Sequence, residues 1–296
     1  MFEVTAVTQW HKSLLRAIWK SLQRYQRLFV ASFLTTLLAI NLNPSIAEAL
    51  DWTDLFRVVP SVIQVVQLSN ISDSQEVELG RQLDRKIGSE VKISRDPAAI
   101  DLVRSIGAQL VPNSDRPNMP YTFQVVDDKN INAFATMGGF VYVNTGTIAQ
   151  ADNRAQLAAV IAHEMGHISG RHALEQIRQM ALAQGLASVA GLDKDQFVNI
   201  GVQLALRLPN SREAEFDADR RGLSTISRSG YAPQAMPAFM QKLVSKSGGV
   251  PGFLSTHPGA DERIVALNDR IERNNLSGQG GLNDRKYQRQ WRNRFR

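Results

Sequence analysis

The chain contains no cysteine among its 296 residues. This absence excludes a disulfide scaffold, a thiolate zinc site, a cysteine nucleophile and a lipid-modified N-terminal cysteine. Internal repeats of the tetratricopeptide length are absent as well. Charged residues make up 21% of the chain and hydrophobic residues 43%, which is typical of a globular protein and excludes a disordered or collagen-like one. The length suits one large domain or two small ones.

The body of the chain also lacks an excess of positive charge, although the whole chain has a formal net charge of +6. Residues 1–27 carry a net charge of +4 and residues 283–296 a net charge of +5, which leaves −3 for residues 28–282. Because a nucleic-acid-binding core needs a basic body, we expect no nucleic-acid partner. A basic protein that binds a membrane or a nucleic acid through its two ends is a rival interpretation.

The N-terminus has the parts of an export signal. Residues 28–42 form an apolar run of 15 residues without charge, preceded by positive residues and followed by Pro44 and small residues up to Ala47 and Ala49. The run is short for a membrane span, which needs about 20 apolar residues. We interpret residues 1–47 as a signal peptide or, alternatively, as an uncleaved anchor. Either way the protein is expected to be exported, to a periplasm or to the non-cytoplasmic side of a membrane.

Two further N-terminal features point to a membrane surface as a partner. Positive residues recur every four positions at Lys12, Arg16, Lys20 and Arg24. This segment forms either a basic amphipathic helix on an anionic membrane or an elongated positive region of the signal. Residues 48–72 are apolar-rich and are predicted to form a connecting helix that packs on the body or rests on a membrane.

Local patterns predict a mainly helical α+β domain over residues 73–275. Ser72 and Gln75 form a capping-box pattern, and Asp96 before Pro97 starts a second helix. Three β-rich runs follow, and the Gly-Gly turn between the last two predicts a hairpin. Helices are then predicted over residues 152–169, 173–190, 194–208, 211–228, 233–246 and 259–273. Residues 276–296 are predicted to form a basic, flexible tail because they are rich in Gly, Asn and Arg.

The clearest chemical motif is H-E-x-x-H, which occurs as His163-Glu164-Met165-Gly166-His167. Positions four apart lie on one face of a helix, so both imidazoles can bind one metal ion. Glu164 is rotated by one residue and can contact a metal-bound water without binding the metal. The apolar run before the motif, residues 157–162, provides the helix that the motif requires. Two unrelated surface histidines are the alternative, which the apolar surroundings disfavour.

A third ligand is expected, because two histidines do not complete a catalytic zinc site. The segment SREAEFDAD, residues 211–219, offers candidate carboxylates. Glu215 and Asp219 lie four apart on one helical face, so one can bind the metal while the other holds a ligand imidazole. A merely solvated acidic face is the alternative.

These motifs resemble a known family, the H-E-x-x-H gluzincin zinc metalloproteases that include HtpX, the CAAX prenyl proteases and BepA-like periplasmic quality-control proteases. HEMGH is similar to the zinc-binding helix of that family, and SREAEFDAD to its S-R-x-x-E-F-x-A-D segment. Residues 132–146 resemble the edge strand and hairpin before the zinc helix, and Ser255–Pro258 with Arg263 resembles the T-H-P-x-x-x-x-R segment. The resemblance covers residues 75–272, and it implies a zincin-like domain with a small sheet or hairpin before the zinc helix.

The resemblance also implies roles for individual residues. It makes Glu215, and not Glu213, the third ligand of one Zn²⁺ per subunit, beside His163 and His167. It makes Asp219 the partner of a ligand imidazole. It further implies that Asn132, Ala133, Phe134 and Ala135 bind the substrate as an edge strand.

Three other side chains have open interpretations. His257 precedes Pro258 and either donates a hydrogen bond to the developing oxyanion, binds zinc as a fourth ligand, or serves as a capping or buried histidine. His172 lies five residues after His167, about 140° around a helix and off the metal face, so we interpret it as structural. Arg263 either pairs with a carboxylate near the site or lies on a helix surface.

The predicted function is that of a zinc metalloendopeptidase acting on unfolded or damaged envelope proteins in protein quality control. Zinc would activate a water molecule, and Glu164 would take its proton and deliver it to the leaving amine. His257 would assist at the carbonyl, and an extended substrate would add to the edge strand. The alternative is a zinc-containing, chaperone-like binding protein with little proteolytic turnover.

Overall fold

The structure is a computed structural model that describes residues 71–183, 194–245, 251–291 and 294–295. The expected signal or anchor over residues 1–47, and all but the end of the expected connecting helix over residues 48–72, lie outside the described residues. Among the helices of the described part, none has both the length and the apolar character that a membrane crossing requires.

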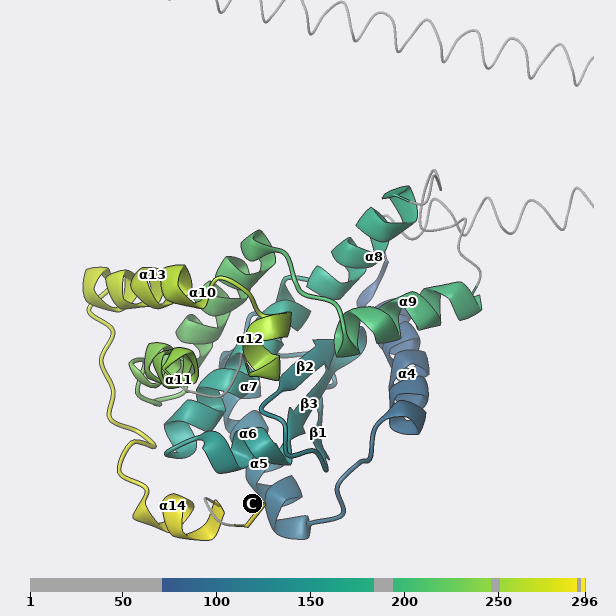
Figure 1. Cartoon of the computed structure of the whole chain (residues 1–296). Coiled ribbons are helices and arrows are strands. Elements are labelled where there is room, and N and C mark those ends of the chain that lie inside the picture. Colours follow the sequence, from purple (N-terminus) through teal and green to yellow (C-terminus); the bar gives the residue numbers. More distant parts are fainter. Residues whose placement is uncertain (1–70, 184–193, 246–250, 292–293, 296) are drawn as a thin grey trace, which may run out of the picture. The chain divides into compact units, whose positions relative to one another are not determined.

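A small mixed sheet lies among the helices of the described part of the chain (Figure 1). Its strands are β1 (Thr122–Val126), β2 (Ala133–Thr136) and β3 (Phe140–Asn144), in the spatial order β1-β3-β2. β2 and β3 form the predicted antiparallel hairpin through the short turn η3 (Met137–Gly139), in which Gly138 and Gly139 have positive φ angles of 77° and 96°. The parallel pairing of β1 with β3 was not predicted, and it leaves β2 at the edge of the sheet.

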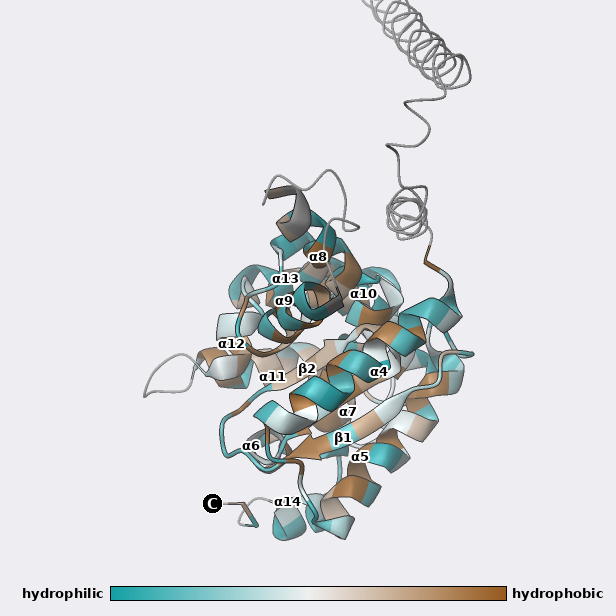
Figure 2. Cartoon of the chain, turned by 90° about the vertical axis from the view of Figure 1, so that its right-hand side faces the viewer, coloured by the Kyte–Doolittle hydropathy of each residue, from teal (hydrophilic) through white to brown (hydrophobic). Residues whose placement is uncertain are grey.

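Helices cover both faces of the sheet (Figures 1 and 2). Along β3, Val141 and Val143 belong to a core shared with α5 (Pro97–Leu110) and α7 (Arg154–Ser169). The alternate residue Tyr142 belongs to a second core with α4 (Asp73–Glu90) and α9 (Lys194–Leu206), where its ring stacks on Phe134. The alternation of side chains along a strand thus divides the interior into two cores.

The first two described helices begin where the capping patterns predicted. The Ser72 side chain accepts a hydrogen bond from the Gln75 amide, and the Gln75 side chain accepts one from the Ser72 amide, which completes the capping box of α4. The Asp96 carboxylate accepts a hydrogen bond from the Ala98 amide at the start of α5, with Pro97 in the first turn. Both predictions are confirmed because a cap depends on residues within one turn.

The remaining helices match the predicted ranges within a few residues in the described part. They are α8 (His172–Ala183), α10 (Arg212–Arg228), α11 (Ala235–Val244) and α13 (Ala260–Arg273), together with α7 and α9. Two short helices were not predicted, α6 (Thr145–Gln150) and α12 (Gly252–Thr256). Five or six residues are too few to show a helical repeat of apolar positions.

The expected flexible tail over residues 276–296 is wrong for its described part. Residues 285–291 form α14 (Arg285–Trp291), and both Tyr287 and Trp291 are buried in the main core. The Tyr287 hydroxyl donates a hydrogen bond of 2.7 Å to the Ile148 carbonyl. The prediction weighed the Gly, Asn and Arg content of the segment and overlooked two aromatic residues spaced one helical turn apart.

Helix α7 crosses α10 at very short range, because glycines lie at the contact. A Cβ atom at Gly166 would lie 2.5 Å from the Ala218 carbonyl oxygen, and one at Gly222 would lie 3.0 Å from the Ala162 carbonyl group. Each helix therefore places a glycine against the backbone of the other. This close crossing brings the H-E-x-x-H segment next to residues 215–219.

A methyl group at Gly166 should push the two helices apart. We expect Gly166→Ala to lower the free energy of unfolding by roughly 1–3 kcal/mol, as overpacking does in a tight core, and to lower the metal content. The measurements are chemical denaturation of the full chain and elemental analysis. Gly88→Ala is the matched control, because nothing lies within 4 Å of a Cβ there and α4 should be unaffected or slightly stabilised. Equal stability and metal content in both variants would contradict the close-packing argument.

Candidate metal centre and active site

Helix α7 carries the H-E-x-x-H motif through the centre of the protein. The Asn153 side chain accepts a hydrogen bond from the Gln156 amide at the start of this helix, and every residue from Ala155 to Ile168 is buried. One turn apart, His163 and His167 turn their Nε2 atoms toward the same point, and these two atoms lie 3.1 Å apart. The pair therefore shares one buried face and is not two surface histidines.

Helix α10 brings a carboxylate to this pair. The Ser211 side chain accepts a hydrogen bond from the Ala214 amide at the start of α10, and Glu215 lies in the first turn. Its Oε2 atom lies 3.4 Å from His163 Nε2, and its Oε1 atom lies 3.3 Å from His167 Nε2. Glu215 is fully buried, whereas Glu213 is exposed to solvent. The structure thus brings together His163, His167 and Glu215.

His257 joins the same cluster from the end of α12. Its Nδ1 atom lies 3.0 Å from the Phe253 carbonyl oxygen, to which it can donate a hydrogen bond, and its ring stacks on Phe253. Its Nε2 atom lies 3.3 Å from Glu164 Oε1. One ligand atom from each of His163, His167, Glu215 and His257 lies within 4.8 Å of the others. His257 is buried and faces the cluster, and it is at the same time the C-cap residue of α12, where its backbone amide donates a hydrogen bond to the Phe253 carbonyl.

Two further buried groups, Asp219 and Arg263, contact the side chains of the cluster. His163 Nδ1 lies 2.9 Å from Asp219 Oδ1. Arg263 donates two hydrogen bonds to the Asp219 carboxylate, of 2.7 and 2.8 Å, and its Nη1 atom lies 2.5 Å from Glu215 Oε2. Only 1% of Arg263 is exposed, so it does not lie on the helix surface. The Arg263 guanidinium therefore holds Glu215, a candidate ligand, and Asp219, the partner of His163, in fixed positions relative to each other.

The charges of the site keep its carboxylates ionised. Burial by itself raises the pKa of Glu215, but the charges of His257 and His167 hold that pKa well below its ordinary value. Burial likewise opposes ionisation of Asp219, and hydrogen bonds from Arg263 lower its pKa. Burial opposes protonation of His163, but its hydrogen bonds to Asp219 and Glu215 raise the pKa to about 9. A metal ion would compete with that proton, because a ligand imidazole must be neutral.

The donor set of the cluster fits a divalent metal ion. Among the described residues, Glu164 Oε1 and Glu215 Oε1 are buried without a hydrogen-bond donor of good geometry, whereas Glu215 Oε2 has the Arg263 cation 2.5 Å away. Buried carboxylate oxygens are costly unless a donor or a cation satisfies them. Imidazole nitrogens together with one carboxylate are the ligands that zinc prefers at catalytic sites. The residues present therefore fit the expected metal.

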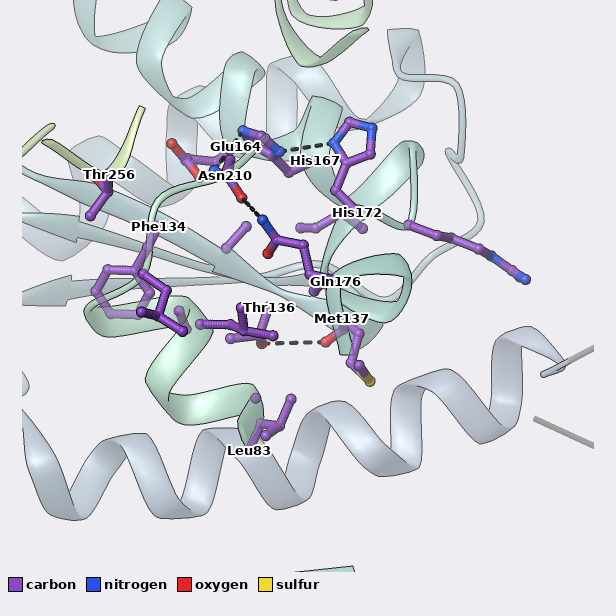
Figure 3. A pocket seen from close by; sticks show the side chains of 18 of the residues that line it. Leu83, Phe134, Thr136, Met137, Glu164, His167, His172, Gln176, Asn210 and Thr256 are labelled. Carbon is purple, nitrogen blue, oxygen red and sulfur yellow. Dashed lines mark hydrogen bonds between the residues drawn. The ribbon is translucent and has the colours of Figure 1, made fainter. Parts of the chain in front are cut away.

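A pocket opens beside the cluster, and Figure 3 shows Glu164 and His167 at one side of it and Phe134 and Thr136 at the other. Its apolar lining includes Leu83, Phe134, Met137, Leu204 and Leu208. Of the four residues predicted to bind substrate, Phe134 and Ala135 line this pocket.

The other two predicted substrate-binding residues, Asn132 and Ala133, lie beside the pocket without lining it. The Asn132 side chain accepts hydrogen bonds from the Ala133 amide and the Thr256 hydroxyl. Ala133 is fully buried. These contacts tie the start of β2 to the chain segment that carries His257.

His172 touches a candidate metal ligand, which sequence reasoning missed. Its Nδ1 atom lies 2.9 Å from His167 Nδ1. Burial and the neighbouring His167 lower the pKa of His172 to about 4, so its ring is neutral at pH 7. The argument from helical rotation assumed one continuous helix, although the predicted helices over residues 152–169 and 173–190 already left a break there. In the structure α7 ends at Ser169 and α8 starts at His172. The Gly170-Arg171 pair was the sequence signal for that break. Asn210 was also missed, and its Nδ2 atom lies 3.5 Å from His167 Nε2.

Comparison with known proteins agrees with this geometry. The sequence profile of Peptidase family M48 matches residues 98–271. The chain is 29% identical over 218 residues to a β-barrel assembly-enhancing protease of Escherichia coli, a match that covers 68% of this chain and 45% of the relative. A protein of the same name from Yersinia pestis is 32% identical over 222 residues, with the same coverage. The mitochondrial metalloendopeptidase OMA1 of Arabidopsis thaliana is 36% identical over 145 residues, 48% of this chain and 30% of the relative.

The chain therefore spans less than half of the length of the assembly-enhancing proteases that it matches. The family match extends from the first turn of α5 to the last turn of α13, so it includes the sheet, the H-E-x-x-H helix and the helix of Glu215. The resemblance noted in the sequence and the predicted fold class, α+β and mainly helical, are both confirmed. This chain belongs to peptidase family M48.

Proposed function

We propose that this protein is a zinc-dependent metalloendopeptidase that hydrolyses peptide bonds of unfolded or damaged proteins. One observation carries the proposal: the Glu215 carboxylate lies 3.3 and 3.4 Å from the two imidazoles of H-E-x-x-H, deep inside the protein. Histidines and carboxylate thus meet at one point beside a pocket, as a catalytic zinc site requires. Membership of a peptidase family supports the reaction class.

His163, His167 and Glu215 would hold one zinc ion per chain. When bound, zinc lowers the pKa of water so that hydroxide is available as the nucleophile near neutral pH, and it polarises the scissile carbonyl. Asp219 and Arg263 would keep His163 and Glu215 in place, because both contact the ligands from the side away from the pocket. Such supporting contacts set the orientation and basicity of the ligands.

Glu164 would act as the general base and then as the general acid. It lies on the pocket wall, and its Oε1 atom has no hydrogen-bond donor of good geometry among the described residues. The charge of His257 outweighs burial and lowers the pKa of Glu164, so the carboxylate is ready to accept a proton. It would take that proton from the attacking water and deliver it to the leaving amine nitrogen. His257 Nε2 would donate a hydrogen bond to the carbonyl oxygen as negative charge develops there.

The substrate would bind as an added strand along β2. The Asn144 amide donates a hydrogen bond to the Asn132 carbonyl, which is the first link between β2 and β3. Hydrogen-bonded pairs alternate along an antiparallel ladder, so Phe134 faces β3 through its backbone and Ala135 directs its N–H and C=O to the open edge. Recognition through the main chain accepts many sequences but requires an extended segment, which favours unfolded proteins.

The N-terminal pattern supports the proposed location of the protein. The positive region, the apolar run and the small residues before position 49 support export to the periplasm or to a membrane on its non-cytoplasmic side. Two of the relatives are named β-barrel assembly-enhancing proteases. Envelope proteins are therefore the proposed substrates, in a quality-control role at a membrane surface.

Removal of the metal tests the proposed function. We expect the purified chain to contain about one zinc per molecule, to cleave casein as an unfolded substrate, and to lose cleavage on treatment with 1,10-phenanthroline. Zinc added after removal of the chelator should restore cleavage. The measurements are elemental analysis and gel or fluorescence assays of casein. Cleavage that continues in a metal-free sample would contradict the proposal.

A chaperone-like protein is the second candidate, and the position of His257 favours it. If His257 were a fourth zinc ligand, no coordination position would remain for water. That function predicts zinc-dependent binding of unfolded casein without turnover. The same assay separates the two functions, because only the protease produces fragments.

A further inference from the structure

We propose that His172 and Asp217 are positioning residues that fix the tautomer and the orientation of His167. The inference rests on the proposed function, in which His167 binds zinc. It concerns a side chain outside the H-E-x-x-H motif and a carboxylate between Glu215 and Asp219 that has no part in the proposed ligand set.

The three side chains form a continuous row of hydrogen-bonding atoms. His167 Nε2 faces the cluster, 3.3 Å from Glu215 Oε1, and His167 Nδ1 faces away from it, 2.9 Å from His172 Nδ1 (Figure 3). On the far side of the second ring, His172 Nε2 lies 3.2 Å from Asp217 Oδ2. The row therefore leads from the metal cluster out to a carboxylate.

The row has one consistent assignment of protons for neutral rings. Asp217 is held as a carboxylate by Arg221, whose Nε donates a hydrogen bond of 2.6 Å, and by Arg220, so it accepts from His172 Nε2–H. A neutral imidazole has one N–H, so His172 Nδ1 is an acceptor and His167 Nδ1 must carry the proton. This leaves the lone pair of His167 on Nε2, which faces the other candidate ligands. The wrong tautomer would place a proton where the metal must bind.

The turn between α7 and α8, at Gly170-Arg171, places the His172 side chain. Gly170 is required next to the ring, because a Cβ atom there would lie 2.3 Å from His172 Nε2. Arg171 has a positive φ of 55°, which is unfavourable for a residue with a side chain. Its guanidinium donates hydrogen bonds to Asp73 and to the Ile71 carbonyl and lies 3.2 Å from the buried Glu76. These contacts hold the unfavourable turn and direct His172 back onto α7.

Helix α10 then supplies the three acidic groups at every second position. Glu215 faces the two imidazoles directly, Asp219 accepts from His163 Nδ1, and Asp217 reaches His167 through His172. Each H-E-x-x-H histidine is thus backed by a carboxylate from the same helix. His172 lies between Asp217 and His167 and hydrogen-bonds to both, so Asp217 acts on His167 without touching it.

The test compares three variants of the full chain with the wild-type protein. His172→Phe fills the space of the ring but has no acceptor, His172→Gln restores an acceptor oxygen, and Asp217→Ala removes the group that sets the tautomer of His172. Glu175→Gln on the exposed side of α8 is the matched control. Zinc affinity is measured by competition with a chromophoric chelator, and the Co²⁺-substituted proteins are compared by visible absorption spectroscopy.

We expect His172→Phe to weaken zinc binding by roughly 10–100-fold and to change the Co²⁺ spectrum, as loss of a supporting hydrogen bond does at metal sites. His172→Gln should recover most of the affinity, and Asp217→Ala should cause a smaller loss. Unchanged affinity in His172→Phe would overturn the inference, as would equal losses in the Phe and Gln variants, since packing alone would then explain them. If His172→Phe does not fold, the Gln and Asp217 variants decide: wild-type affinity in Asp217→Ala refutes the relay. Failure of the wild-type chain to bind zinc would instead refute the proposed function.

Discussion

Glu164→Gln should leave the metal content and the stability of the protein unchanged and reduce casein cleavage by about 10²–10⁴-fold, the usual contribution of a general base. The amide has the shape of the carboxylate but cannot accept and deliver a proton. Glu164 lies on the pocket wall beside the candidate ligands, and its Oε1 atom lies 3.3 Å from His257 Nε2 without a hydrogen bond of good geometry. Its replacement should therefore affect the reaction more than the fold.

The experiment combines a casein assay, elemental analysis and thermal unfolding on the same preparations. Glu213→Gln is the matched control, because it makes the same chemical change on an exposed side chain of α10. Its cleavage rate should equal that of the wild-type protein. If Glu164→Gln cleaved casein at the wild-type rate, Glu164 would lose its role as general base. If Glu164→Gln lost both cleavage and zinc, Glu164 would have to be considered a ligand.

Glu215→Ala should abolish stable zinc binding and, with it, all proteolysis. The carboxylate faces both imidazoles of the motif and is fully buried, so alanine removes its candidate ligand oxygens from the cluster. In the proposed protease His257 serves the carbonyl and not the metal, so only two protein ligands would remain, fewer than the three of a catalytic zinc site. The change also removes one of the two carboxylates that pair with the buried Arg263, which should cost several kcal/mol of folding free energy at most, since Asp219 still pairs with it.

Zinc content after dialysis against a chelator is the decisive measurement, with circular dichroism as the check on folding. Glu213→Ala is the control, and it should retain zinc. The opposite pattern, with zinc lost in the Glu213 variant and kept in the Glu215 variant, would move the ligand assignment by two residues. Glu215→Gln extends the test if the alanine variant does not fold, because the amide keeps the shape but binds zinc more weakly.

The sequence by itself determined those features that depend on neighbouring residues. The starts of α4 and α5 followed from Ser72 and Asp96, since a cap forms within one helical turn. The β2–β3 hairpin followed from its two glycines, and the shared direction of His163 and His167 from their spacing of four. The family resemblance rested on short motifs of this kind and needed no knowledge of the packing.

Only the tertiary structure decided which distant segments meet. The parallel pairing of β1 with β3 and the buried position of Arg263 depend on long-range packing that no local pattern encodes. The spacing of Tyr287 and Trp291 is a local signal, but the surface that buries them is formed only in the folded chain. The break at Gly170-Arg171 was within reach of the sequence, but only the folded chain shows that it turns His172 back toward His167. Glu215 reaches the histidines because Gly166 and Gly222 let two helices touch backbone to backbone, and the fit of those two surfaces is a property of the folded chain.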